Sequence, residues 1–287
     1  MRKLLLLLAL IAAAGASAQK RSFVRVLTYN VCEGLKMDTT ASKERFVAWM
    51  RELDPDLAAL QEMNGFTQAR LEKLAAAYGH SYAVLLKDTG YPVALTSKYP
   101  IVAKRVTDNM HHGFLIARTG GYNIVVAHLS PFSWRKRQQE VATIQAWIEA
   151  SGERRRWIVL GDLNSCSPLD REGYADGRLL TLNRRGDDPR TGGKRQNLVD
   201  GELDFTTQQA LLDAGFCDAF KLFHSEYVPS YPSPARAAGN PNPVTCRLDY
   251  IYLSRDLRAR ALDGRILHEG AAAMLSDHLP LYIDLKR

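Results

Sequence analysis

Short apolar segments with strand character alternate with amphipathic helices along most of this 287-residue chain. Residues 23–29 are rich in β-branched and aromatic side chains, which favours a strand. Residues 42–53 repeat apolar side chains at helical spacing and end at Asp54-Pro55, which favours a helix. The same patterns predict strands over residues 57–60, 82–86, 92–97, 122–127, 157–160, 248–253 and 281–285, and helices over residues 66–78, 137–148 and 206–212. Alternation of this kind is typical of an α/β fold, in which helices cover the faces of sheets.

Two stretches show neither the helical nor the strand period of apolar residues. Residues 170–200 are polar and glycine-rich and are predicted to form a long surface loop, a kind of segment that is usually functional or mobile. Residues 228–245 are proline-rich and irregular. The chain shows no internal repeat and no interdomain linker, so we expect one domain over residues 19–287.

The first eighteen residues have the pattern of a secretory signal peptide. Arg2-Lys3 is a short positive region, residues 4–14 are apolar, and Ala16-Ser17-Ala18 is a small-residue cleavage site. The apolar stretch is short for a transmembrane helix, and no cysteine follows it that could carry a lipid. We therefore expect residues 1–18 to be removed from a secreted or periplasmic protein without a transmembrane anchor.

The charge balance favours an anionic partner. The chain is 46% hydrophobic and 24% charged, which excludes a disordered or multi-span membrane protein. Its formal charge of +7 becomes +5 (36 minus 31) without the two cations of the leader. A basic protein suits nucleic acid, phospholipid surfaces or phosphorylated metabolites, although the charge also simply promotes solubility.

The four cysteines, Cys32, Cys166, Cys217 and Cys246, are too few for a disulfide scaffold and allow three pairings. They show no C-x-x-C spacing, so a zinc site has little support. Cys166 and Cys246 each lie near an acidic residue discussed below, and they would approach bridging range if those residues converge. Buried free thiols are the equal alternative.

Polar side chains stand at the ends of several predicted strands. Asn30, Glu62 and His128 each follow an apolar strand directly or by one residue. Further positions of this kind are Asp162 and Asn164 after residues 157–160, Asp249 at the start of 248–253, and Asp277-His278 before 281–285. One such residue commonly caps a turn, but six such positions in one chain favour a shared site on rigid strand ends.

The residue types of this set fit one chemistry. Carboxylate and amide oxygens are hard ligands, which suit Mg²⁺, Mn²⁺ or Ca²⁺ rather than zinc. The histidines supply acid–base capacity and phosphate contacts. The chain has no nucleophile elbow, no Walker-type phosphate loop and no dinucleotide fingerprint. The set therefore indicates metal-assisted attack of water on a phosphate ester.

Six short motifs carry a resemblance to a known family. In chain order they are Thr28-Tyr29-Asn30-Val31, Leu60-Gln61-Glu62, Ala127-His128-Leu129, Gly161-Asp162-Leu163-Asn164, Arg247-Leu248-Asp249-Tyr250-Ile251 and Ser276-Asp277-His278-Leu279-Pro280. Together they resemble the endonuclease/exonuclease/phosphatase superfamily, which has the deoxyribonuclease I-like fold. The resemblance spans Phe23 to Leu285. A mild departure is Thr96-Ser97-Lys98, where many members have Leu-Ser-Arg.

The resemblance implies a four-layer α/β/β/α sandwich, with two mixed β-sheets packed face to face and helices outside. It also implies the catalytic and metal-binding roles. Glu62 is the principal metal ligand, Asn30 and Asp277 lie near the metal, Asp162 and Asn164 act on the attacking water and the phosphate, Asp249 pairs with His278, and His128 contacts a phosphate oxygen or protonates the leaving group. Either Asp162 or His278 could be the general base.

Three further residues are candidates for substrate binding. Arg135 and Arg137 open a helix beside the strand that ends at His128, where cations are mildly unfavourable with the helix dipole. A contact with an anionic substrate would explain them. His111 and His112 point to opposite faces if they lie in a strand, so one of them, His112, is expected to face the substrate.

The leading hypothesis is a secreted phosphoesterase that depends on a divalent metal, with a nuclease or other phosphodiesterase as the first choice. A sphingomyelinase-like enzyme or an inositol- or sugar-phosphate phosphatase is the alternative. A non-catalytic binding module is the alternative of another class, and the intact set of acidic residues and histidines argues against it. We expect a monomer that binds a phosphate ester, nucleic acid included, and no stable protein partner.

Overall fold

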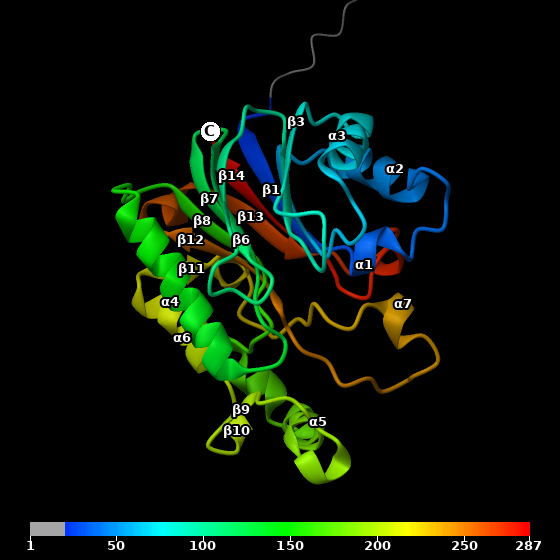
Figure 1. The fold of residues 1–287 in the computed structure, drawn as a ribbon, viewed down its shortest axis with the longest axis vertical. Coiled ribbons are helices and arrows are strands. Elements are labelled where there is room, and N and C mark those ends of the chain that lie inside the picture. The colour runs from blue at the N-terminus through cyan, green and yellow to red at the C-terminus, as the bar shows by residue number, and fades with distance from the viewer. Residues whose placement is uncertain (1–20) are drawn as a thin grey trace, which may run out of the picture.

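The computed structural model describes residues 21–287 (Figure 1), so the predicted leader lies outside the described residues. Its strands are β1 (Phe23–Asn30), β2 (Leu57–Gln61), β3 (Tyr82–Leu85), β4 (Ala94–Ser97), β5 (Val102–Val106), β6 (Phe114–Thr119), β7 (Tyr122–His128), β8 (Trp157–Asp162), β9 (Leu198–Val199), β10 (Glu202–Leu203), β11 (Phe216–Asp218), β12 (Asp249–Ser254), β13 (Ala261–Ile266) and β14 (Leu281–Lys286). Two six-stranded sheets have the orders β13-β14-β1-β2-β4-β3 and β11-β12-β8-β7-β6-β5, and β9 pairs with β10. The β1–β2 and β7–β8 pairs are parallel and their neighbours antiparallel, so both sheets are mixed.

The outer faces of the two sheets are covered by helices (Figure 1). The helices are α1 (Cys32–Leu35), α2 (Glu44–Leu53), α3 (Gln68–Ala77), α4 (Trp134–Ala150), α5 (Arg178–Asp187), α6 (Thr206–Asp213) and α7 (Pro234–Ala237), with 3-10 helices η1 (Pro168–Tyr174), η2 (Pro189–Thr191), η3 (Phe220–Leu222), η4 (Arg255–Arg260) and η5 (Ala272–Met274). Helices α2 and α3 lie on one sheet, and α4 and α6 on the other, while α5 and α7 lie away from those faces. Within residues 21–287, no helix is long and apolar enough to cross a bilayer.

Three apolar layers hold the sandwich together. Val26 from β1 and Ile251 from β12 belong to the fully buried layer between the sheets. The next residue of β1, Leu27, points the other way and packs with Phe46 of α2, as the two-residue period of a strand requires. On the other side of the sandwich, Val141 of α4 packs against the outer face of the second sheet. The predicted four-layer α/β/β/α sandwich is thus confirmed.

The predicted loop over residues 170–200 is wrong, because this stretch contains α5, η2 and β9 (Figure 1). Leu179 is the buried residue of α5, and polar residues dominate its last two turns, so the apolar face of this helix is too small to stand out in the sequence. The segment is anchored through Arg247, whose buried guanidinium donates to Asp170 and to Asp218 at 2.6 Å each. We call residues 165–205 the insertion. The other predicted strands and helices were confirmed, whereas β5, β6, β11 and β13 were not predicted.

All four described cysteines carry free thiols, so the free-thiol alternative describes the structure. Cys166 and Cys246 are buried in a small apolar cluster beneath the insertion, together with Tyr174 and Leu203. Burial raises the pKa of the Cys166 thiol to about 12, which keeps it protonated and unreactive at neutral pH.

The buried side chain of His80 makes the fold sensitive to acid. Its Nε2–H donates to the carbonyl oxygen of Pro55 (2.8 Å), so the neutral ring accepts at Nδ1 from the hydroxyl of Thr96 (2.9 Å). Burial lowers the pKa of His80 from 6.5 to about 4. The folded protein therefore resists protonation at a site that the unfolded chain protonates readily.

We expect His80 to lower the free energy of unfolding by about 2 kcal/mol as the pH falls from about 7 to about 5. In that range the unfolded chain takes up a proton at this residue and the folded protein does not. Urea denaturation of the wild type and of His80→Gln across this range checks the expectation. The variant should be less stable at neutral pH but lose less stability on acidification. Parallel losses in the two proteins would contradict it.

Candidate active site

The predicted site residues meet where the ends of strands from both sheets come together. In the second sheet, Asp162 at the end of β8 pairs in register with His128 of β7 on one side and Asp249 of β12 on the other. In the first sheet, Asn30 ends β1 and Glu62 follows β2. The Asn30 amide nitrogen donates to Glu62 (3.1 Å) and to Asp162 (3.0 Å), so it joins the two sheets.

The backbone at this edge adopts conformations that side chains other than glycine rarely allow. Gly161 has φ +141°, and a Cβ there would lie 1.8 Å from the carbonyl oxygen of Ala127. Only glycine therefore lets β8 approach β7 this closely beside His128 and Asp162. Glu62 and Asn164 have φ values of 60° and 48°, and each such residue costs roughly 1 kcal/mol. Strain of this kind is common where function fixes the direction of a side chain.

Asn30 lies beside Glu62 and Asp162, and its orientation adds a positioning role. Its amide oxygen accepts from the backbone N–H of Cys32 (3.1 Å), which fixes the amide nitrogen toward Glu62 and Asp162. A nitrogen that donates cannot ligate a cation. Asn30 therefore positions the two carboxylates beside the pocket, and its place next to a metal stays a prediction.

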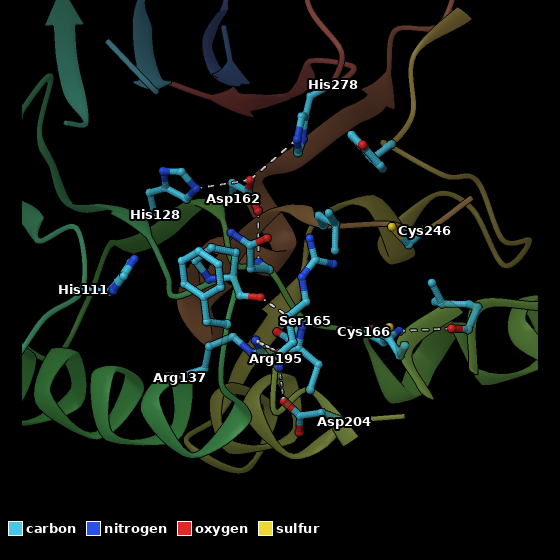
Figure 2. A pocket seen from close by; sticks show the side chains of 18 of the residues that line it. His111, His128, Arg137, Asp162, Ser165, Cys166, Arg195, Asp204, Cys246 and His278 are labelled. Carbon is cyan, nitrogen blue, oxygen red and sulfur yellow. Dashed lines mark hydrogen bonds and ion pairs between the residues drawn. The ribbon is translucent and has the colours of Figure 1, made fainter. Parts of the chain in front are cut away.

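His278 is held between two carboxylates, Asp249 and Asp162, and Figure 2 shows its contact with Asp162. Its Nδ1 lies 2.8 Å from Asp249, which also accepts from the hydroxyl of Ser230 (2.7 Å), and its Nε2 lies 3.8 Å from Asp162. Burial alone would lower the pKa of His278, but the charges of Asp249 and Asp162 outweigh it and raise the pKa to about 10. The imidazole is therefore a cation at neutral pH, with Nδ1–H on Asp249 and Nε2–H directed into the site. The predicted His278–Asp249 pair is present.

Asp162 lies at the centre of the site (Figure 2). It accepts from the backbone N–H of Asn164 (3.0 Å) and lies 3.5 Å from Nε2 of His128. Burial, reinforced by the charge of Asp249 and opposed by that of His278, raises the pKa of Asp162 to about 7. Burial lowers the pKa of His128 well below its usual value, so this ring is neutral. A carboxylate with a pKa near neutrality suits proton transfer.

The site holds more negative charge than the chain itself balances. Glu62 and Asp277 line the same pocket as Asp162. Among residues 21–287, no lysine or arginine lies within ion-pair distance of these three carboxylates or of Asp249. This set of uncompensated oxygen donors suits a hard divalent cation.

The residues open onto a pocket of about 480 Å³, which the insertion closes on one side. Arg137 lines it, but its guanidinium is buried and bound to Asp204 (3.1 Å), Asn197 (2.9 Å) and the carbonyl of Ser130 (3.0 Å). The predicted substrate contact of Arg137 is therefore corrected to a structural role that holds the insertion against α4. Arg135 is also corrected, because it is exposed, stacks on Trp134 and does not line the pocket.

Arg195 is an exposed cation at this pocket, where the sequence predicted Arg135 and Arg137 instead. It extends from the insertion into the pocket lining (Figure 2). The only sequence signal for it is the basic pair Lys194-Arg195 within the stretch that was predicted to be a loop.

His112 does face the pocket, where its ring stacks on that of His128 with centroids 4.3 Å apart. The neighbouring His111 lines the pocket as well, so the expected separation to opposite faces is wrong. The two residues precede β6 and lie in a bend rather than in a strand. Tyr91 and Phe132 also line the pocket, and no sequence signal singled them out.

Comparison with known proteins agrees with this geometry. The sequence profile described as "Endonuclease/Exonuclease/phosphatase family" matches residues 27–278. No curated protein matches the chain significantly.

Solved structures with a similar fold include an AP endonuclease from Archaeoglobus fulgidus, at a TM-score of 0.66 and 17% identity. They also include the 3′ phosphatase NExo from Neisseria bound to a product DNA hairpin, at a TM-score of 0.64 and 20% identity. A third is the 3′-5′ exonuclease NExo from Neisseria meningitidis, at a TM-score of 0.63 and 19% identity. Each comparison covers 92% of this chain and 100% of the other. At these identities, the likeness establishes the shared fold.

Proposed function

Because the chain belongs to the Endonuclease/Exonuclease/phosphatase family and thus hydrolyses phosphate esters, we propose that it is a divalent-metal-dependent phosphodiesterase, with nucleic acid as its first substrate class. The observation that carries this proposal is the convergence of Glu62, Asp162 and His278 from distant parts of the chain on one pocket. These groups offer a proton acceptor, a cationic hydrogen-bond donor and oxygen ligands, which together suit attack of water on a phosphate.

Asp162 is the proposed general base. It takes a proton from the attacking water, whose oxygen forms a bond to phosphorus as the bond to the leaving oxygen breaks. His278 cannot take this role while it is a cation between Asp162 and Asp249. Its Nε2–H instead donates to an oxygen on which charge develops, and Asp249 stabilises the imidazolium. Neutral His128 offers a further donor to a phosphate oxygen.

Glu62 and Asp277 would hold the divalent cation, and Asn30 would fix the direction of Glu62. When bound, the cation supplies positive charge that neutralises the phosphate oxygens in the transition state. Mg²⁺, Mn²⁺ and Ca²⁺ all fit this donor set. We further propose that the protein acts outside the cytoplasm, a suggestion that the leader-like residues 1–18 support.

A substrate panel tests the proposal. The purified protein is incubated with duplex DNA, single-stranded DNA, RNA, sphingomyelin and inositol phosphates, each with Mg²⁺, Mn²⁺, Ca²⁺ or EDTA. We expect cleavage of a nucleic acid that EDTA abolishes. Turnover confined to sphingomyelin or inositol phosphates would contradict the nuclease assignment, and turnover that EDTA leaves unchanged would contradict metal dependence.

Arg195 is expected to bind the anionic substrate without taking part in the chemistry. Loss of one charged contact to a phosphate costs about 1.5 kcal/mol, so Arg195→Ala should raise KM about tenfold and leave kcat within about twofold. Arg184→Ala is the matched control, because Arg184 is exposed on the same insertion but pairs with Glu202 (3.6 Å). Equal KM values for Arg195→Ala and wild type in steady-state kinetics would contradict this role.

A further inference from the structure

One side of the pocket is lined by a continuous set of rings that the proposed reaction does not use. Tyr91, His111, His112 and Phe132 all line the pocket, and we call them the aromatic wall. Neighbouring rings lie 5.6 Å (Tyr91–His112), 4.3 Å (His111–His112) and 5.4 Å (His111–Phe132) apart. The wall is continuous with the reaction centre, because His112 stacks on His128.

The wall is held rigidly although it is built from loops. The buried carboxylate of Glu140 in α4 accepts from the backbone N–H of His111 (2.5 Å) and from that of Ser130 (2.8 Å). One side chain thus fixes both the loop before β6 and the loop after β7. Gly113 has φ +97°, and a Cβ there would lie 2.8 Å from the carbonyl oxygen of Val106, so the first loop has little freedom.

The outer members of the wall are exposed, and they are not packing anchors. Tyr91 is 40% exposed and Phe132 is 48% exposed. Large aromatic side chains at the mouth of a pocket, next to a phosphate site, are typical of surfaces that stack on a ring of the ligand.

The charge of the wall is also informative. It includes no lysine, arginine or carboxylate. Burial lowers the pKa of His112 to about 3 and also lowers the pKa of His111, so both rings are neutral. A neutral aromatic surface suits a flat, uncharged ring better than it suits a second phosphate.

We propose that the aromatic wall stacks on the planar base of a nucleotide whose phosphate lies against His128 and His278. This inference rests on the proposed function, because it takes that pair to mark the position of the phosphate. It names the part of the substrate that the protein recognises beyond the phosphate, and it assigns that recognition to side chains outside the family motifs.

Calorimetric titration with three small phosphates tests the inference. The probes are AMP, ribose 5-phosphate, which lacks the base, and phosphocholine, and Mg²⁺ is present so that the metal site is filled, with phosphate release measured to show that no probe is hydrolysed. We expect AMP to bind at least about tenfold more tightly than ribose 5-phosphate, as stacking of one base allows. AMP binding no tighter than ribose 5-phosphate, or phosphocholine binding tighter than AMP, would overturn the inference.

Variants of the exposed rings locate the effect. Tyr91→Ala and Phe132→Ala should each weaken AMP binding about five- to tenfold and leave ribose 5-phosphate unchanged, and Phe132→Trp should retain AMP binding. Phe223→Ala is the matched control, because Phe223 is 40% exposed but lies outside the pocket lining. If both alanine variants bind AMP as the wild type does, the wall is not the base site.

Failure of this inference is distinguishable from failure of the proposed function. Turnover of a DNA or RNA phosphodiester is measured with Mg²⁺ on the same preparations. Metal-dependent turnover without preference for AMP would overturn only the stacking site. Preference for AMP that the alanine variants abolish, without turnover of any phosphodiester, would support the site and overturn the proposed reaction.

Discussion

Replacing Glu62 with glutamine is expected to lower turnover of a phosphodiester by about 10³-fold, because the amide keeps the shape of the side chain but loses the negative charge that would hold the cation. Glu62 follows β2 in a left-handed conformation, and its carboxylate accepts from Asn30 and from the backbone of Glu33. The protein thus holds this carboxylate in a fixed direction with no basic partner.

Steady-state kinetics over a range of Mg²⁺ concentrations measures the effect, and the midpoint of thermal unfolding shows whether the fold is retained. Glu33→Gln is the matched control, because Glu33 is a neighbouring exposed carboxylate that pairs with Lys36 (3.0 Å). We expect near wild-type turnover for this control. A Glu62→Gln protein that keeps more than about a tenth of wild-type turnover would exclude a role for this carboxylate in the transition state.

The second large effect is expected at the His278–Asp249 pair. Asp249→Asn removes the negative charge that holds the imidazolium, so we expect turnover to fall by about 10²- to 10³-fold. His278→Gln should cause a loss of at least the same size. Because the two side chains act as one unit, the double variant should be little slower than the more damaged single variant.

The pH dependence of turnover distinguishes this account from simple misfolding. A neighbouring anion favours the charged form of a histidine and raises its pKa, so removal of the Asp249 charge lowers the pKa of His278 from about 10. If activity requires the imidazolium, Asp249→Asn should lose activity at a lower pH than the wild type does. The alkaline limb of its pH–rate profile should move down by more than about one pH unit. Asp263→Asn, which removes a carboxylate bound to Tyr282 (2.7 Å) outside the pocket, is the control. An unshifted alkaline limb in Asp249→Asn would contradict a cationic His278.

The sequence predicted the strand ends well, because the information there is local. An apolar run followed by a polar residue identifies both the strand and its edge, as at His128 and Asp162. The parallel pairing of β7 with β8 then brings these two residues into register. The alternation of strands and helices indicated an α/β fold, whereas the four-layer arrangement was what the family resemblance implied.

The corrections concern residues whose partners lie far away in the sequence. Arg137 begins a helix beside a strand end, which is a favourable place for an anion contact. Its actual partners Asn197 and Asp204 belong to the insertion, 60 and 67 positions away, and no local pattern links them to α4. Tyr91 and Phe132 of the aromatic wall escaped prediction for the same reason, because they lie in separate loops without periodicity, whereas His112 was predicted to face the substrate.

The central claim is that side chains scattered over the chain form one site for a hard cation and a phosphate. Crystals soaked with Mn²⁺ and a nucleoside monophosphate, with data collected at the manganese absorption edge, test it most directly. We predict an anomalous peak within ligand distance of Glu62 and Asp277, with the phosphate beside it against His128 and His278. A peak elsewhere, or none in this pocket at saturating Mn²⁺, would contradict the account.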